Sequence, residues 1–230
     1  MIVLKQLNKS FGKNPVLQNI SFEFSAGKVY GMVGQNGAGK TTLFRCLAGL
    51  ESYKGIIERS GQSEKAYLGY VPAELHFLAK LTGAEYLRLM LQARNRKLDS
   101  LESINVFDLP LNEYIVSYST GMKKKLSILG ALLQDNHVFI FDEVYNGLDF
   151  QSCLLLTDII KRLKKENKLV LISSHVFALL EETCDEILYL KDGTIARSSD
   201  RSEFPNLKTF LSEDMNANNL DTLFDQLKSP

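Results

Sequence analysis

The chain has 230 residues, of which 45% are hydrophobic, and its 27 Lys and Arg side chains balance 27 Asp and Glu side chains. This length suits one α/β domain, alone or with a small inserted lobe, and the lack of a basic excess argues against a dedicated nucleic-acid binder. Three scattered cysteines form no metal-binding pattern, which indicates reduced cytosolic thiols, and no stretch approaches the ~20 apolar residues that would cross a bilayer.

The first part of the chain is predicted to form short strands around one helix. Alternating apolar residues, separated by turn-prone segments such as Gly12–Pro15, predict strands at Ile2–Leu7, Ile20–Phe24, Val29–Val33, Gly55–Arg59 and Tyr67–Val71. A helix is expected from Lys40 to about Leu47, because its apolar residues share one face. The N-terminus lacks the apolar core of a secretory signal, so none is expected.

The middle of the chain is predicted to be helical, and the rest alternates between strands and helices. Helical spacing predicts helices at Thr82–Arg94 and Thr120–Leu133, within an inserted lobe of about 75–133. The later elements are expected at Val138–Phe141, Ser152–Lys165, Leu169–Ser173, Val176–Glu182 and Glu186–Leu190. Apolar strands that alternate with helices predict a mostly parallel sheet covered on both faces.

A polar tail is expected from about Ser198 to the end, residues 198–230. Its apolar residues Leu220, Leu223, Phe224 and Leu227 fall at helical spacing. The favoured interpretation is a helix that docks on its own domain, rather than a regulatory device.

A glycine-rich stretch, Gly34–Thr41, fits the pattern G-x-x-x-x-G-K-[ST] between a predicted strand and a predicted helix. Glycines allow a sharp turn whose backbone N–H groups, with the helix N-terminus, attract phosphate oxygens. Lys40 is expected to reach the β- and γ-phosphates, and Thr41 to place its hydroxyl on Mg²⁺. The residues expected to bind ATP here are Gly34, Asn36, Gly37, Ala38, Gly39, Lys40, Thr41 and Thr42.

Two carboxylates follow the apolar strand Val138–Phe141. Asp142 at the strand tip is expected to hold Mg²⁺ through a water, and Glu143 to orient and deprotonate the attacking water. An Asp-Glu pair after an apolar run is often a helix cap or a solvated turn. Downstream of a phosphate loop, the catalytic interpretation is favoured.

Three further motifs narrow the class. Tyr118–Met122 resembles the signature sequence of ABC ATPases, Asn146–Asp149 resembles their D-loop, and Ser173–His175 resembles their H-loop. Together with the phosphate loop and the carboxylate strand, they stand in the order typical of that family. The chain thus resembles ABC transporter ATP-binding proteins over about residues 2–197, most closely those of the bacterial export-type branch.

The resemblance implies a P-loop NTPase fold of the ABC type within one domain, 1–230: a mostly parallel core sheet, an antiparallel β subdomain and the inserted helical lobe. It implies Mg²⁺-dependent ATP hydrolysis by a homodimer, or by a dimer with a related ATPase. Each ATP would lie between Lys40, Asp142, Glu143 and His175 of one protomer and the signature helix of the other. The partner would contribute Ser119 and Gly121, with Asp149 nearby.

The implied setting is the cytoplasmic face of the plasma membrane, beside an integral membrane permease and without nucleic acid. In this family an aromatic residue stacks on adenine, and Phe11 stands in that position; a core phenylalanine is the alternative. His175 is expected to contact the γ-phosphate, the alternative being a surface histidine. Lys123–Lys125 is expected to be a solvated helix face rather than a nucleic-acid patch.

The sequence departs from the family pattern at several points. Ala73 stands where a glutamine is expected to touch Mg²⁺ or water and to sense the membrane partner, and Glu74 beside it points the other way in an extended segment. Thr120 and Met122 replace a glycine and a glutamine of the signature, and Val144 replaces a proline. The departure at Ala73 puts coupling in doubt more than ATP binding.

Three other functions stand beside the transporter. Another P-loop enzyme would have no use for the signature motif. A protein that senses ATP without hydrolysing it would not need Glu143. A soluble ABC ATPase that moves no cargo, serving assembly or translation, is the main alternative. The sequence leaves open the cargo, the direction of transport, the pairing of subunits and the role of the tail.

Overall fold

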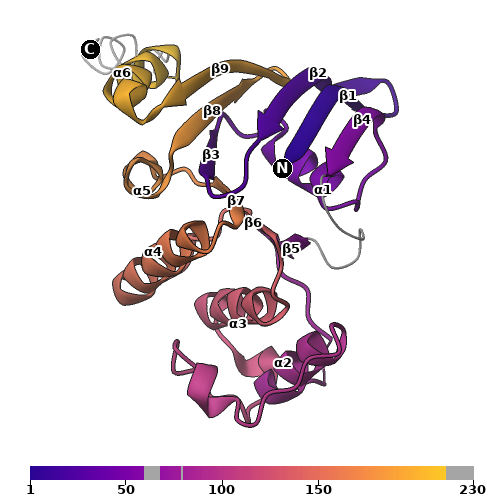
Figure 1. Cartoon of the computed structure of the whole chain (residues 1–230), viewed down its shortest axis with the longest axis vertical. Helices are drawn as coiled ribbons and strands as arrows, with labels where there is room; N and C mark the ends of the chain where they lie inside the picture. The colour runs from indigo at the N-terminus through magenta and orange to yellow at the C-terminus, as the bar shows by residue number, and fades with distance from the viewer. Residues whose placement is uncertain (60–67, 79, 216–230) are drawn as a thin grey trace, which may run out of the picture.

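The computed structural model describes residues 1–59, 68–78 and 80–215. Its larger sheet has six strands in the order β5-β6-β7-β3-β8-β9 (Figure 1). The first five are parallel, and the last is antiparallel to its neighbour. The strands are β3 (Val29–Val33), β5 (Leu68–Val71), β6 (Val138–Phe141), β7 (Leu169–Ser173), β8 (Glu186–Lys191) and β9 (Thr194–Asp200).

A smaller antiparallel sheet has the order β2-β1-β4 and comprises β1 (Ile2–Phe11), β2 (Asn14–Phe24) and β4 (Lys54–Arg59). The first two strands are longer than the alternating pattern predicts. Register shifts along their pairing break that alternation. Pro15, which suggested a turn, pairs with Ser10 within β2, where an edge strand tolerates a missing N–H.

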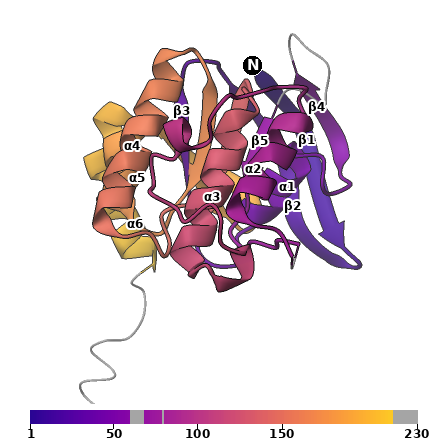
Figure 2. The same cartoon turned by 90° about the horizontal axis from the view of Figure 1, so that it is seen from below.

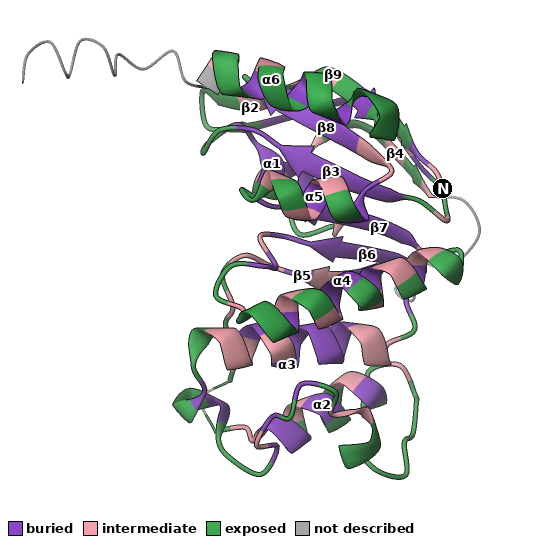
Figure 3. Ribbon diagram, turned by 90° about the vertical axis from the view of Figure 1, so that its left-hand side faces the viewer, coloured by how far each residue is buried: buried purple, intermediate pink, exposed green. Residues whose placement is uncertain are grey.

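Both faces of the larger sheet are covered, and Figure 3 shows its central strands almost wholly buried. Along β3, Val29 and Val33 face a core shared with the helices α3 to α6, whereas Tyr30 and Met32 face a core shared with α1 and the smaller sheet. The helices are α1 (Lys40–Leu47), α4 (Phe150–Lys165), α5 (Phe177–Thr183) and α6 (Phe204–Met215), the last preceded by a 3-10 turn, η4 (Arg201–Glu203).

A helical region lies between β5 and β6 in sequence and at the opposite end of the molecule from the smaller sheet (Figures 1 and 2). It holds α2 (Gly83–Gln92), the 3-10 turns η2 (Glu102–Ile104) and η3 (Ile115–Ser117), and α3 (Thr120–Leu133). Thr82 and Glu85 form a capping box that begins α2. Gly130 lets α3 pack closely on α2, because a Cβ there would lie 2.8 Å from the ring of Tyr86.

The C-terminal part differs from the polar tail that the sequence suggests. Residues 198–200 complete β9, and α6 then packs Phe204, Leu207 and Leu211 into the core. The predicted helix around Leu220–Leu227 lies outside the described residues. Within the described ranges, no helix combines the length and apolar character that a membrane span requires.

Candidate nucleotide site

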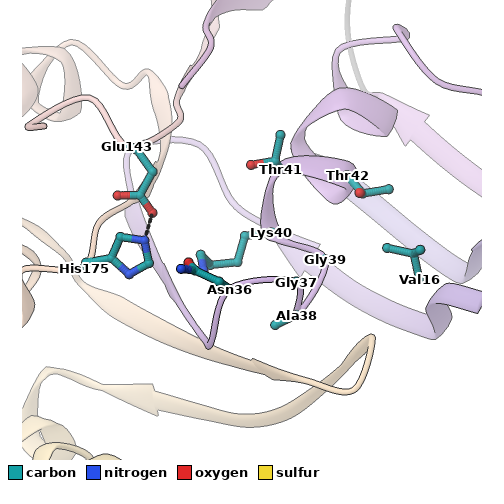
Figure 4. A pocket seen from close by; sticks show the side chains of 10 residues that line it. All are labelled: Val16, Asn36, Gly37, Ala38, Gly39, Lys40, Thr41, Thr42, Glu143 and His175. Carbon is teal, nitrogen blue, oxygen red and sulfur yellow. Dashed lines mark ion pairs between the residues drawn. The ribbon is translucent and has the colours of Figure 1, made fainter. Parts of the chain in front are cut away.

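A cavity of about 330 Å³ opens where β3 passes into α1 (Figure 4). The phosphate loop and α1 form one side, and Glu143 and His175 approach from the other. Its lining residues are Val16, Asn36, Gly37, Ala38, Gly39, Lys40, Thr41, Thr42, Glu143 and His175. The structure thus brings together residues from four sequence segments, three of which the motifs identify.

The start of α1 is shaped to leave its backbone donors free. Gly39 is its N-cap residue, with φ of 106° and no side-chain cap, and a Cβ there would lie 2.9 Å from the carbonyl oxygen of Val16. Gly37 has φ of 83°, with nothing within 4 Å of its Cβ position. The first N–H groups of a helix have no intrahelical partner, so this helix start is suited to bind an anion.

Lys40 lies against the loop that precedes it. Its Nζ donates hydrogen bonds to the carbonyl oxygens of Gly34 at 2.7 Å and Gln35 at 3.2 Å. Burial lowers the pKa of Lys40, and the carboxylates of Asp142 and Glu143 oppose this effect. The ammonium is thereby held beside the space that phosphates would occupy.

Asp142 is fully buried at the end of β6. The hydroxyls of Ser173 and Tyr70 donate to its two carboxylate oxygens, at 2.6 and 3.3 Å, and its backbone N–H donates to Val71. Burial, together with this carboxylate, raises the pKa of Tyr70, which keeps the phenol a donor. These bonds fix the carboxylate in one orientation.

Glu143 has a strained backbone and one unsatisfied oxygen. Its φ is 48°, a conformation that non-glycine residues rarely adopt, and its N–H donates to Ser173 Oγ at 2.8 Å. Nε2 of His175 lies 3.2 Å from Oε1, yet no described residue gives this buried oxygen a well-aligned hydrogen bond. Asn146 donates to the other oxygen at 3.3 Å. Oε1 therefore keeps an acceptor position that lacks a well-aligned donor.

The residues around the cavity fit magnesium held together with phosphate. Within residues 1–59, 68–78 and 80–215, no three His, Cys, Asp or Glu side chains form a group that could hold a metal alone. Mg²⁺ usually takes one or two protein ligands and completes its shell with phosphates and water. The Thr41 hydroxyl lines the cavity and supplies one such oxygen, whereas Asp142 is fully buried outside the lining, so its role at Mg²⁺ through a water stays a prediction.

Phe11 does not line this cavity. Its side chain is 48% exposed, so the alternative of a core phenylalanine is wrong. Lys9 Nζ lies 4.6 Å from the ring centroid and is itself held by Glu51 at 3.0 Å. One face of the ring is thus occupied by a cation, and adenine stacking at this position remains a prediction.

Ser119, Gly121 and Asp149 also lie outside the cavity lining and form a separate cluster, in which Ser119 and Asp149 are exposed and Gly121 is half-buried. Ser119 caps α3 by accepting from Met122 N at 3.2 Å, and Asp149 caps α4 while pairing with Lys125 at 2.7 Å. The Lys125 bond is the main cause of the lowered pKa of Asp149. Gly121 is required by a close approach, because a Cβ there would lie 2.5 Å from the carbonyl oxygen of Gly147.

Several contributing residues escape the motifs. Val16, Tyr70 and Ser173 line or brace the site, but only Ser173 lies within a recognised motif. The expectation of a solvated lysine face at Lys123–Lys125 is wrong, because none of the three is exposed and Lys124 is only 2% exposed. No sequence signal marks Lys124, since its partners are backbone carbonyls.

Comparisons with known proteins identify the family of the chain. The family model described as ABC transporter matches residues 17–146, more than half of the chain. An uncharacterized ABC transporter ATP-binding protein of Methanocaldococcus jannaschii is 34% identical over 84% of this chain and 74% of its own length. The ABC-type transporter ATP-binding protein EcsA of Bacillus subtilis is 30% identical over 88% of each chain.

Solved structures share the fold. One ATP-binding subunit of an ABC transporter has a TM-score of 0.78 at 24% identity and full coverage of both chains. A dimeric bacterial ABC transporter cassette has a TM-score of 0.79 at 20% identity, covering 87% of this chain and 99% of its own. The family match and the sequence relatives are the decisive findings: the chain belongs to the ABC transporter family, as an ATP-binding ATPase.

Proposed function

We propose that this ATPase energises a separate membrane-spanning permease by closing as a dimer around ATP and reopening after hydrolysis. One observation carries the proposal: the phosphate loop and Glu143 share one cavity, whereas the exposed Ser119 and the half-buried Gly121 lie outside it. Since one chain does not join these two halves, a second chain would supply the missing half.

The residues of the cavity divide the chemistry among them. The uncapped start of α1 and the Lys40 ammonium bind the phosphates and offset their charge. Thr41 and Asp142 would hold Mg²⁺, which supplies further charge neutralisation when bound. Glu143 accepts a proton from the attacking water, and His175, whose Nε2 lies 3.2 Å from Oε1, orients that carboxylate.

The second chain would add the start of α3. Ser119 is exposed, and its hydroxyl presently accepts from one of the helix's own N–H groups, that of Met122. A γ-phosphate placed there would meet the positive end of the helix dipole together with that hydroxyl. ATP would therefore hold two chains together, and loss of the γ-phosphate would release them.

We place the permease contact at a groove of about 280 Å³ on the helical region. Leu78 and Val116 along it are 69% and 70% exposed, which is uncommon for large apolar side chains that stay in water. The groove is lined by Leu75, His76, Phe77, Leu78, Ile115, Val116 and Lys123. The groove begins two residues after Ala73. A partner docked there would therefore touch the segment that follows β5, close to the end of the larger sheet where Asp142 and Glu143 lie.

Copurification from the native host tests this proposal. Glu143→Gln, tagged and extracted gently from membranes with ATP present, should carry a polytopic membrane protein in stoichiometric yield. Adding Leu78→Asp and Val116→Asp should release that protein while ATP binding persists. Recovery from the soluble fraction alone would overturn the proposal and support a soluble ABC ATPase that moves no cargo.

A further inference from the structure

Three consecutive lysines at the start of α3 have three different environments. Lys123 lines the apolar groove, and Lys125 pairs with the exposed carboxylate of Asp149 at 2.7 Å. Lys124 is 2% exposed and turns toward the larger sheet. A buried ammonium is costly unless it is paired or hydrogen-bonded, so its partners indicate its role.

Those partners are two successive carbonyl oxygens of the segment that leaves β5. Nζ of Lys124 donates to Pro72 O at 3.2 Å and to Ala73 O at 3.0 Å. The preceding carbonyl, that of Val71, accepts the backbone N–H of Asp142 at 2.9 Å. The backbone of residues 71–73 is thus bonded to α3 through Lys124 and to the end of β6 through Asp142.

The charge of Lys124 also faces the catalytic carboxylates. Burial lowers the pKa of Lys124, and Asp142 and Glu143 oppose that effect, as they do for Lys40. Lys124 is therefore a second cation in the field of the same two acids. It reaches them from the helical region rather than from the phosphate loop.

Ala73 gives this link its importance. Its side chain has no polar atom, so the loop cannot bind water, magnesium or a neighbouring helix through that side chain. The hydrogen bond from Lys124 to the Ala73 carbonyl oxygen needs no polar side chain at residue 73. The contact between this loop and α3 is therefore made by the long side chain of Lys124.

We propose that Lys124 is a positioning residue for hydrolysis, which clamps residues 72–73 onto the signature helix and so aligns that helix with the Asp142–Glu143 end of the sheet. This inference rests on the proposed function. The groove residues Leu75–Leu78 begin two residues after the clamped segment. Movement of a partner docked there would therefore act on the Lys124 hydrogen bonds.

Two variants and a matched control test the clamp. Lys124→Met removes charge and donors while keeping length, and Lys124→Arg keeps both. Met has a similar length and an apolar stem, so Lys124→Met should fold, at the cost of leaving the Pro72 and Ala73 carbonyl oxygens without this donor. Lys161→Met is the control, because Lys161 pairs with Glu182 on the exposed surface of α4.

Hydrogen exchange of the full-length chain without nucleotide gives the first measurement. Loss of two charge-assisted hydrogen bonds should accelerate exchange in the segment 72–76 by ~10-fold in Lys124→Met, and by less in Lys124→Arg. Exchange in the phosphate loop should stay unchanged. Unaltered exchange in 72–76 would overturn the clamp whether or not the protein hydrolyses ATP.

Steady-state ATP hydrolysis gives the second measurement. Lys124→Met should lower kcat by ~10-fold with ATP affinity within ~3-fold of the unaltered chain, and Lys124→Arg should recover part of the loss. A kcat equal to that of Lys161→Met would overturn the positioning role. If the unaltered chain has no ATPase activity that Glu143→Gln removes, the proposed function fails. Hydrogen exchange in the segment 72–76 then remains the test of the Lys124 clamp.

Discussion

Two glycine-containing helix starts, those of α1 and α3, are expected to face the same phosphates but differ in how their first N–H groups are capped. α1 begins at Gly39 with no side-chain cap, inside a cavity that also holds Glu143 and His175. α3 begins at Ser119, whose hydroxyl already accepts from Met122 N, on an exposed surface. The first is suited to bind an anion as it stands, whereas at the second the Ser119 side chain already accepts from one of the helix's own N–H groups.

The difference separates binding from hydrolysis. Because the donors of α1 are free in a single chain, ATP should bind one chain without help. In the proposed dimer α3 serves the cavity of the other chain, so its contribution should appear only in turnover by paired chains. Variants on the two sides should therefore affect different steps.

The largest effect is expected at Glu143. Glu143→Gln removes the free carboxylate oxygen and should lower ATP turnover by ~10³-fold or more while preserving ATP affinity. The trapped ATP should also shift the chain to a dimer in size-exclusion chromatography. Glu182→Gln, an exposed pair partner of Lys161, is the matched control and should change neither property. Equal turnover in Glu143→Gln and the unaltered chain would contradict the catalytic role.

A smaller effect is expected at the start of α3. Asp and Asn cap helices about as well as Ser, so Ser119→Asp and Ser119→Asn should both fold. A carboxylate facing the γ-phosphate should lower turnover by ~10²-fold in Ser119→Asp, well beyond any loss in Ser119→Asn. Single-chain ATP affinity, measured by titration calorimetry, should be the same in both. A weakened affinity in Ser119→Asp would place Ser119 in its own chain's site.

Adenine stacking should give a more modest change confined to binding. Phe11→Ala should weaken ATP binding by ~1–3 kcal/mol, since stacking of a base on an aromatic ring is worth about that much. Inorganic triphosphate lacks the base, so its competition for the site should be unaffected. Equal weakening of both ligands would show that Phe11 supports the phosphate loop instead of the base.

The smallest effect is expected at a third helix start, that of α2. Thr82→Ala removes a capping box remote from the nucleotide cavity and should lower the free energy of unfolding by ~1 kcal/mol. ATP affinity and turnover should stay unchanged. Altered turnover in this variant would mean that any damage to the helical region reaches the active site, which would weaken the interpretation of Ser119.

The sequence predicts best what is local. The phosphate loop, the buried strands of the larger sheet and the α/β fold of the ABC type follow from short motifs and alternating elements. Long-range packing is not encoded in this way. Register shifts lengthen β1 and β2, and β9 pairs antiparallel with β8. Both features depend on pairing between strands rather than on a local motif.

The candidate site shows the same division. Lys40 and Glu143 lie in one cavity as the motifs suggest, yet Val16 joins them from a strand that carries no motif. Lys124 is the clearest failure of sequence reasoning, because a lysine in a charged run is usually solvated. Its burial depends on carbonyls that no residue type reveals.

Complementation between two inactive variants tests the central claim most directly, that a complete site needs two chains. Lys40→Ala should fail at the phosphate loop, and Ser119→Asp at the signature helix, so each homodimer should be nearly inactive. In a 1:1 mixture, half of the dimers pair the two variants and hold one intact site of two, which predicts about a quarter of the normal rate. A mixture no more active than its separate components would contradict the two-chain site.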